Sequence, residues 1–239
     1  METIRIAHLY YDIMNLYGDN GNIRALVKNL EKQDVKVVLS NLTIDDQINF
    51  KNFDFFYIGS GTVENTILIL EDLKQYSEGI LEAIKNKKHF LITGDTLSIF
   101  GKTLNNDKEI KCLNIFNFDA FINKERIVGE QFFSTTLIKQ EIIGFQNRET
   151  YINEVKTPLF NVNQGNGYDN KNNIEGIRRN NFYATYLIGP LLIRNPYFTE
   201  YLIKSILKER KIKYTKQEQD TSYKAYEEYL NNFKQKTEE

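Results

Sequence analysis

Four short apolar runs, each followed by a turn or by a helical pattern, constrain the fold of this chain most strongly. The runs are residues 4–9, 35–39, 53–61 and 90–93, and the third ends in a glycine turn. Ile23, Leu26, Val27 and Leu30 have helical spacing, and a long amphipathic helix is expected between the glycine turn and about Lys85. This alternation predicts a parallel sheet covered by helices on both faces.

The loops that follow these strands are the natural place for a site. In open parallel sheets the functional crevice lies at the carboxyl ends of the strands. The loops 15–22, 59–61 and 93–96 should therefore meet at one edge. The third loop belongs to the stretch "LITGDTLSIFG", which predicts a turn from a buried strand into a helix. Many α/β enzymes carry their nucleophile on such a turn, but the tip here reads Gly94-Asp95-Thr96.

The second half of the chain has a different pattern. The runs "CLNIFNFDAFI", "RIVGEQFFSTTLI", "EIIGFQN" and "FYATYLIG" are short, aromatic and β-branched, and they predict antiparallel strands that continue the same sheet. Two helical segments follow Pro196, and the second, about 217–236, is charged enough to be a solvated packing helix. Because no linker separates the halves, we expect one domain over 1–210, with 211–239 as its charged helical extension.

Composition narrows the class of protein. The 239 residues carry a formal net charge of −1, which argues against nonspecific nucleic-acid binding. A single cysteine, Cys112, excludes an internal disulfide framework and fits a reducing compartment. The chain starts in a strand-like pattern without a signal peptide, and no apolar run has the length of a membrane span. The expectation is a soluble cytoplasmic protein.

Four motifs, in this order and at these spacings, resemble a known family. They are "MNLYGDNGN" (14–22), "FFYIGSG" (55–61), "GNGYDNKNNIEG" (165–176) and "ATYLIGPLLIRNP" (184–196). They are similar to the CobB/CobQ-type class I glutamine amidotransferases, above all to the glutaminase subunits of lipid II isoglutaminyl synthases. The resemblance spans about 6–207. It implies a flavodoxin-like α/β fold with a central, mostly parallel sheet and antiparallel additions, and a Mur-ligase-like partner subunit.

The family chemistry needs a cysteine nucleophile on the elbow, a histidine base and an oxyanion hole. Carried over by the resemblance, the cysteine position is Gly94 and the histidine position is Ile188, in "TYLIGP". Both catalytic groups of the family are therefore missing, and no residue of this chain is assigned a catalytic role.

Other side chains offer only weak substitutes. Cys112 lies away from the elbow, and His8 and His89 are better explained as structural residues. Thr96 and Ser98 have hydroxyls near the elbow but no evident base. Asp95 could act as a base, although a helix N-terminus would lower its pKa and favour a capping role.

Parts of a ligand pocket remain in the sequence. Gly59, Ser60 and Gly61 keep the turn whose amides would form the oxyanion hole, with serine in place of one family glycine. Arg126, in "RIVGE", matches a family arginine that would hold the substrate carboxylate, as its guanidinium is suited to do. An exposed arginine at a strand start is an equal alternative. A further departure from the family pattern is Gln146-Asn147-Arg148, where the family has Glu-Asn-His. The loop 163–173 resembles a family loop that faces the pocket.

The sequence contains no motif for a metal or a nucleotide. Asp45-Asp46 and the acidic residues of 107–109 read as solvated loop charges, and no Walker motif is present. No cofactor is expected. Three hypotheses remain: a degenerate amidotransferase subunit that supports or regulates a Mur-ligase-like enzyme in peptidoglycan precursor amidation; a module that binds glutamine or another amino acid without turnover; and an active amidotransferase with a non-standard nucleophile at Asp95, Thr96 or Ser98.

Overall fold

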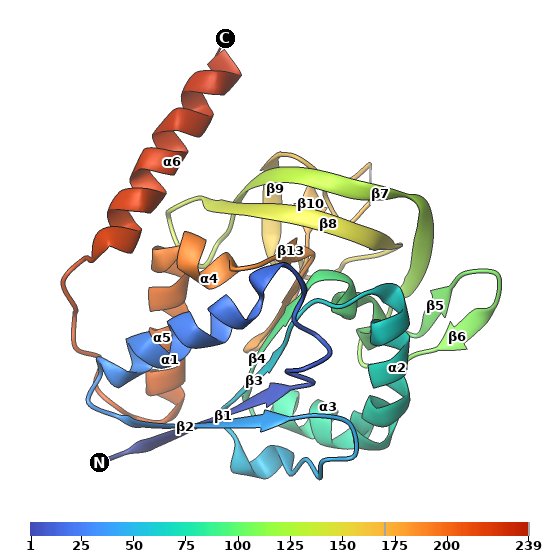
Figure 1. Ribbon diagram of the computed structural model, residues 1–239, viewed down its shortest axis with the longest axis horizontal. Helices are drawn as coiled ribbons and strands as arrows, with labels where there is room; N and C mark the ends of the chain where they lie inside the picture. Colours follow the sequence, from blue (N-terminus) through green and yellow to red (C-terminus); the bar gives the residue numbers. More distant parts are fainter. Residues whose placement is uncertain (170, 239) are drawn as a thin grey trace.

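The computed structural model of the chain describes residues 1–169 and 171–238, and its core is a six-stranded sheet (Figure 1). The strand order is β11-β12-β4-β3-β1-β2, and all neighbours are parallel except β11 and β12. The four expected strands all form, with β3 shorter than the apolar run that predicts it. The bounds are β1 Thr3–Leu9, β2 Lys36–Leu42, β3 Phe55–Ile58, β4 His89–Thr93, β11 Ile177–Arg179 and β12 Phe182–Thr185.

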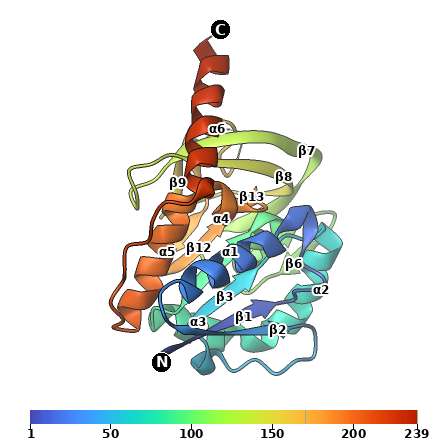
Figure 2. The same ribbon diagram turned by 60° about the vertical axis from the view of Figure 1, so that its left-hand side comes forward.

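Helices cover both faces of this sheet, as the alternating pattern predicts (Figures 1 and 2). Helices α2 (Val63–Leu73) and α3 (Ser77–Lys85) bury Ile69 and Ile80 against the face that carries Phe56. Helices α1 (Asn20–Glu31) and α5 (Pro196–Glu209) bury their apolar side chains against the opposite face. The short helices are η1 Leu16–Gly18, η2 Phe50–Asn52 and α4 Leu191–Arg194.

The expectation of one long helix up to Lys85 is wrong. A 3-10 turn, η3 (Lys74–Tyr76), separates α2 from α3, and Tyr76 leaves the helical region with φ −102° and ψ 5°. The break turns Tyr76 toward the loop before β3. Its ring contacts Phe50, and its hydroxyl donates to the backbone carbonyl of Asp46 at 3.1 Å. Tertiary contacts thus override the helical pattern at this point.

The second half builds mainly a second sheet, which corrects the expectation that its strands continue the first. Only β12 and β11 extend the parallel sheet. The second sheet has the order β10-β9-β7-β5-β6, and β8 pairs with both β7 and β13. The long strands β7 and β8 pair with each other over most of their length, and a register shift between Ile122 and Ile127 bends β7 (Figure 1). The bounds are β5 Thr103–Asn105, β6 Glu109–Lys111, β7 Asp119–Ser134, β8 Ile142–Ile152, β9 Phe160–Gln164, β10 Ile174–Glu175 and β13 Leu187–Ile188.

The charged C-terminal helix α6 (Thr221–Glu238) packs on the second sheet through its aromatic side chains. Tyr226 is buried against Phe132 and Ile143, and its hydroxyl donates to the carbonyl of Glu141 at 2.8 Å. The C-terminal end of the helix projects beyond the rest of the fold (Figure 2). Within 1–169 and 171–238, no helix combines the length and the apolar character needed to cross a membrane.

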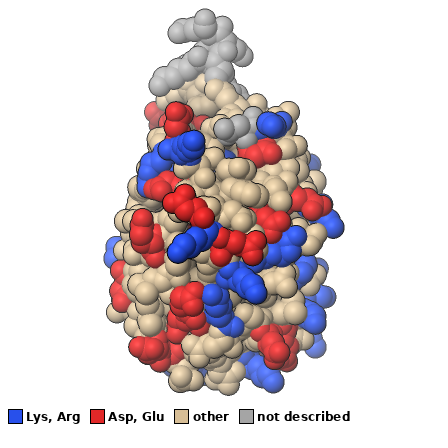
Figure 3. Space-filling model, turned by 90° about the vertical axis from the view of Figure 1, so that its right-hand side faces the viewer, with Lys and Arg blue, Asp and Glu red and all other residues tan. Residues whose placement is uncertain are grey.

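Charges of both signs are intermixed on the face shown in Figure 3. That face carries no extended single-sign field, in keeping with the net charge of −1. A uniformly basic surface, the usual electrostatic footprint of a nucleic-acid-binding protein, is not seen there.

Candidate functional site

The turn after β4 has the backbone geometry of an elbow. Residues Gly94–Phe100 form a 3-10 helix, η4, directly after Thr93, and Gly94 has a φ of +67°. L-residues with a side chain reach this region only at a cost, and the nucleophile elbow of α/β enzymes is a strained turn of this kind. Every residue of η4 is buried.

The space beside Gly94 is filled by two side chains. A Cβ placed on Gly94 would lie 2.2 Å from Ser60 Oγ, 2.6 Å from Ser60 Cβ and 3.2 Å from Ile188 Cγ2. Ser60 and Ile188 are both buried. The structure therefore brings Gly94, Ser60 and Ile188 into one spot, although 94 residues separate Gly94 from Ile188 along the chain (188 − 94). No side chain fits on Gly94 unless Ser60 moves.

The glycine turn 59–61 is tightly packed against the loop after β1. A Cβ on Gly59 would lie 2.2 Å from the Met14 carbonyl oxygen, and one on Gly61 would lie 2.5 Å from Met14 Sδ. Gly59 is thus required by the close approach of the backbone, whereas a side chain at Gly61 would have to displace the Met14 side chain. The Ser60 amide donates to Asp19 Oδ2 at 2.6 Å. The amide at the centre of the expected oxyanion hole is therefore already bound to a carboxylate.

Asp19 is a buried charge centre that the sequence analysis did not single out. Besides the Ser60 amide, its Oδ2 accepts from Thr93 Oγ1 at 2.8 Å, so Asp19 ties the loops after β1, β3 and β4 together. Burial raises its pKa to about 6, against the opposing effect of these hydrogen bonds. The only signal in the sequence is one aspartate in a Gly- and Asn-rich loop after a buried strand.

The hydroxyls near the elbow are used by the backbone. Thr96 Oγ1 donates to the Gly59 carbonyl at 2.7 Å, and Ser98 Oγ donates to the Asp95 carbonyl at 2.7 Å. Both side chains are buried, and neither hydroxyl donates to a group that could act as its base. A hydroxyl that donates to a carbonyl is held away from the role of nucleophile.

Asp95 points into the second sheet. Its carboxylate accepts hydrogen bonds from the amides of Glu149 and Thr150 and from Thr150 Oγ1, the last at 2.7 Å. Burial raises its pKa, although these bonds oppose the shift. The expectation of a lowered pKa is wrong, because the cost of desolvation outweighs the helix terminus. Asp95 fastens the elbow to β8.

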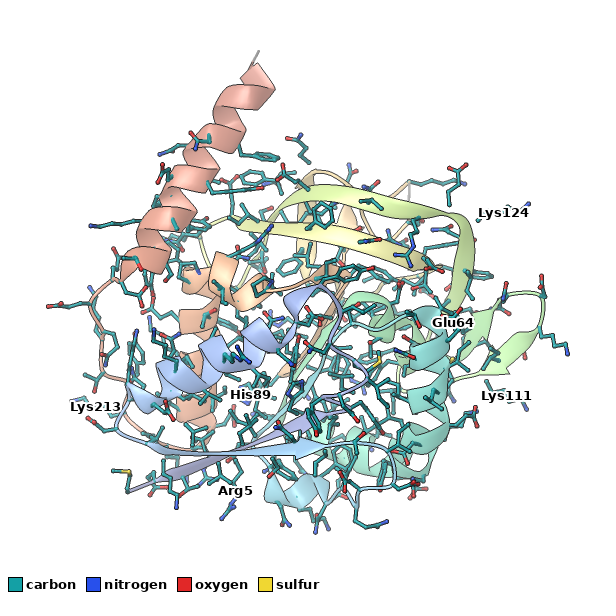
Figure 4. The ribbon with its side chains drawn as sticks, in the orientation of Figure 1. Arg5, Glu64, His89, Lys111, Lys124 and Lys213 are labelled. Carbon is teal, nitrogen blue, oxygen red and sulfur yellow. The ribbon has the colours of Figure 1, made fainter. Side chains whose placement is uncertain are left out.

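Neither the cysteine nor the two histidines lie at the elbow. Cys112 follows β6, and burial raises the pKa of its thiol to about 12, which opposes a thiolate. His8, on β1, packs against the Tyr57 ring, and burial lowers its pKa to about 4. His89 lies inside the molecule at the amino end of β4, whereas Lys111 and Lys124 point outward (Figure 4).

His89 should make folding sensitive to acid. Its Nε2 lies 2.9 Å from Ser205 Oγ, and burial lowers its pKa to about 3. His89 is therefore protonated below about pH 6.5 in the unfolded chain but stays neutral in the folded chain. As a result, the free energy of unfolding falls as the pH drops below 6.5. With these pKa values, the His89 contribution lowers the free energy of unfolding by about 2 kcal/mol at pH 5 relative to pH 7.5.

Urea titrations of the wild type and His89→Gln at both pH values measure this contribution. Because other titrating groups are shared, the difference between the two proteins isolates His89. The variant should have a smaller loss at pH 5. Equal losses in both proteins would contradict the assignment. Asp19 and Glu175 act in the opposite sense. Burial raises their pKa values in the folded protein, so these two groups make the fold more stable at low pH than at neutral pH.

Arg126 lies on β7 and contacts three polar side chains, one from η1 and two from β8. Its guanidinium donates to Tyr17 Oη at 3.1 Å and to Asn147 Oδ1 at 2.7 Å, and it forms an ion pair with Glu149. Its side chain is 42% exposed. A substrate carboxylate could bind here only by displacing Glu149. The structure therefore gives Arg126 a carboxylate partner, but one from its own chain.

The sequence matches the profile of the CobB/CobQ-like glutamine amidotransferase domain over residues 5–196, which is most of the chain. The chain belongs to the CobB/CobQ-like glutamine amidotransferase family. The matched region ends at the start of α5, so α6 lies outside it.

Two curated proteins are similar to this chain along almost its whole length. Both are lipid II isoglutaminyl synthase (glutamine-hydrolyzing) subunits named GatD. The protein from Streptococcus pneumoniae is 28% identical over 232 residues, which are 95% of this chain and 87% of that protein. The protein from Staphylococcus aureus is 28% identical over 222 residues, 92% of this chain and 91% of the relative.

Solved structures of glutamine amidotransferases share the fold. The glutaminase domain of Trypanosoma brucei CTPS, with bound acivicin, has a TM-score of 0.53 at 11% identity, over 89% of this chain and 96% of that one. A glutamine amidotransferase from Thermotoga maritima has a TM-score of 0.50 at 11% identity, over 88% of this chain and 86% of the other. The expected class I amidotransferase fold is thus confirmed.

This member of the amidotransferase family buries an arginine behind the elbow. Arg148, on β8, is fully buried. Its guanidinium donates to Gln146 Oε1 at 3.0 Å, to the Gly167 carbonyl at 2.7 Å and to the Thr150 carbonyl, and it stacks 4.2 Å from the centre of the Tyr186 ring. The loop 163–173 is thereby anchored to β8 at Gly167. Asn170 of that loop lies outside the described residues.

The acidic residues do not gather into a metal site. Within the part of the chain that the structure describes, no group of three or more His, Cys, Asp or Glu side chains could hold an ion. Asp46 is instead used locally, because its Oδ2 accepts from the Thr43 amide at 2.8 Å.

Proposed function

We propose that this chain is a non-catalytic glutamine amidotransferase-like subunit that supports or regulates a Mur-ligase-like enzyme, in peptidoglycan precursor amidation or a related pathway. The observation that carries the proposal is the 2.2 Å separation between Ser60 Oγ and a Cβ on Gly94. A nucleophile cannot occupy this position in the fold as it stands. The partner follows from the relatives, which are named as subunits of a synthase.

Three further contacts support the loss of hydrolysis. Ile188 places an aliphatic side chain where the family resemblance puts the base, and it lies beside Gly94. The Ser60 amide is bound to Asp19. The hydroxyls of Thr96 and Ser98 donate to backbone carbonyls. Nucleophile, base and oxyanion donor are therefore each replaced or occupied, and each of them contributes to amide hydrolysis by a cysteine enzyme.

Binding of glutamine without turnover is the weaker alternative. Arg126 would have to exchange Glu149 for the carboxylate of the ligand, and Gly94, Asp95 and Thr96 are buried. The third hypothesis, an unusual nucleophile at Asp95, Thr96 or Ser98, would require these residues to give up the hydrogen bonds described above.

We expect no ammonia release from glutamine, either by the chain alone or by the chain with its ligase. A coupled glutamate dehydrogenase assay measures release, and calorimetry with glutamine should detect no saturable heat. Copurification with a tagged Mur-ligase-like protein of the same organism should recover a stoichiometric complex. Ammonia release that Ser98→Ala or Asp95→Asn abolishes would overturn the non-catalytic assignment. If the ligase does not copurify with the chain, the proposed partner is wrong.

A further inference from the structure

We propose that a second site, remote from the elbow, binds a phosphorylated small molecule. The site is a cavity of about 650 Å³ between the edge of the first sheet and the segment that enters β9 of the second. This volume lies within the usual range for ligand pockets, about 300–1,000 Å³. Residues 156–161 and 178–180 line it, together with Thr136.

The lining is one-sided in charge. It contains lysine and arginine but no aspartate or glutamate, in a chain whose acidic residues outnumber its basic ones by 32 to 31. Cations and neutral hydrogen-bond donors therefore line the hollow, and the acidic side chain paired with Lys156, Glu154 at 3.8 Å, is not part of the lining. Such a set of groups favours an anion with several acceptor oxygens.

Arg178 is the main cation. On β11 it pairs across the strands with Tyr183, so the two share one face of the sheet. Burial raises the pKa of the Tyr183 hydroxyl, and the charge of Arg178 opposes that rise. The Arg178 guanidinium has no hydrogen bond or ion pair to any residue that the structure describes. Arg179 is held on the opposite face, where its Nη1 donates to the Ile115 carbonyl at 3.3 Å and its guanidinium lies 4.5 Å from the Phe116 ring centre.

The other donors come from the facing segment. Lys156 has one distant counterion, Glu154, at 3.8 Å, and its side chain is 68% exposed. The side chains of Thr136, Thr157 and Asn161 have no hydrogen-bond partner within 1–169 and 171–238. Two cations and three neutral polar groups thus surround the hollow. The cations can bind the oxygens of a phosphate ester, and the neutral groups can bind the hydroxyls of the molecule that carries the phosphate.

The backbone around these side chains is fixed. The Arg178 amide donates to the Thr157 carbonyl at 2.9 Å, the Leu159 amide donates to the Glu175 carbonyl at 3.1 Å, and Thr135 Oγ1 donates to the Leu159 carbonyl at 2.9 Å. The two walls are therefore joined before any ligand arrives. A preformed frame reduces the entropy lost on binding, because the side chains and not the backbone need to be ordered.

The test is a calorimetric titration of the full chain with inorganic phosphate, ribose 5-phosphate and ribose, at constant ionic strength set with chloride. Phosphate and ribose 5-phosphate should bind saturably, and ribose should not. Arg178→Gln and Lys156→Gln should each weaken binding about tenfold or more, since each removes a charge-assisted contact. Lys108→Gln, the same charge change in the β5–β6 turn, is the matched control and should bind as the wild type does.

Saturable binding of phosphate but not of ribose 5-phosphate would restrict the site to the free anion and overturn the phosphorylated ligand. The site itself would be refuted if chloride competes equally or if Lys108→Gln weakens binding as much as Arg178→Gln. Because the readout is binding, the result does not depend on whether the elbow is catalytic.

Discussion

Gly94→Ala should destabilise the protein by about 3 kcal/mol, and Ser60→Gly should rescue part of that loss. The new methyl group would overlap Ser60 Oγ and Cβ, and overpacking of this kind costs about 1–3 kcal/mol. A second cost, about 1–2 kcal/mol, comes from placing a side chain at the φ of +67°. Removing the Ser60 side chain relieves the first cost and leaves the second.

A double-mutant cycle measured by urea denaturation separates the two costs. Ser60→Gly alone should change stability little, about 1 kcal/mol at most, because it removes a buried hydroxyl that has no hydrogen-bond partner. The coupling between the two positions should then be about 1–3 kcal/mol. Additive effects would show that Ser60 does not fill the space beside Gly94.

The same geometry decides how catalysis could be restored. Gly94→Cys with Ile188→His should stay inactive, because the thiol has no room beside Ser60. The triple variant that adds Ser60→Gly should give slow ammonia release above background. In a Cys112→Ala background the introduced thiol is also the only one, so its rate of alkylation reports how accessible the elbow is. A double variant as active and as reactive as the triple would contradict the blocking role of Ser60.

The sequence predicts the parts of this site that depend on local pattern. The apolar runs and glycine turns indicate parallel strands, and their loops do meet, since Asp19 accepts from Ser60 and Thr93. The pattern does not reveal that Ser60 fills the space of a side chain on Gly94. That fact depends on how closely two loops that are far apart in the chain approach each other.

The second sheet and the buried charges were harder to predict for the same reason. The run "EIIGFQN" (141–147) predicts a strand, but not that this strand extends to Ile152 or that it pairs with β7 instead of the edge of the first sheet. The sequence pattern also does not show which face of this strand is buried. The strand buries Gln146, Arg148 and Thr150, all polar, because their partners come from the elbow and from the loop after β9. Tertiary partners, absent from any local pattern, make this face favourable.

Arg148→Met should lower the free energy of unfolding by about 3 kcal/mol or more. Met fills much of the volume but donates no hydrogen bond, so Gln146 Oε1 and the carbonyls of Thr150 and Gly167 lose a buried donor. The charge of Arg148 also helps to lower the pKa of Glu175, which burial raises to about 7. Without the arginine, that buried carboxyl should take up a proton more readily.

Arg126→Met is the matched control, because it removes the same group from a partly exposed site. Its ion pair with Glu149 is solvated, and surface pairs contribute about 1 kcal/mol or less. The difference in free energy of unfolding between the two variants therefore reports the effect of burying the arginine, because both variants lose the same side chain. Limited proteolysis adds a second readout: in Arg148→Met the loop around Gly167 loses its anchor to β8 and should be cut faster, while in Arg126→Met it should not. Equal destabilisation by the two variants, or an unchanged cleavage rate in Arg148→Met, would mean that Arg148 does not hold this loop against the back of the elbow.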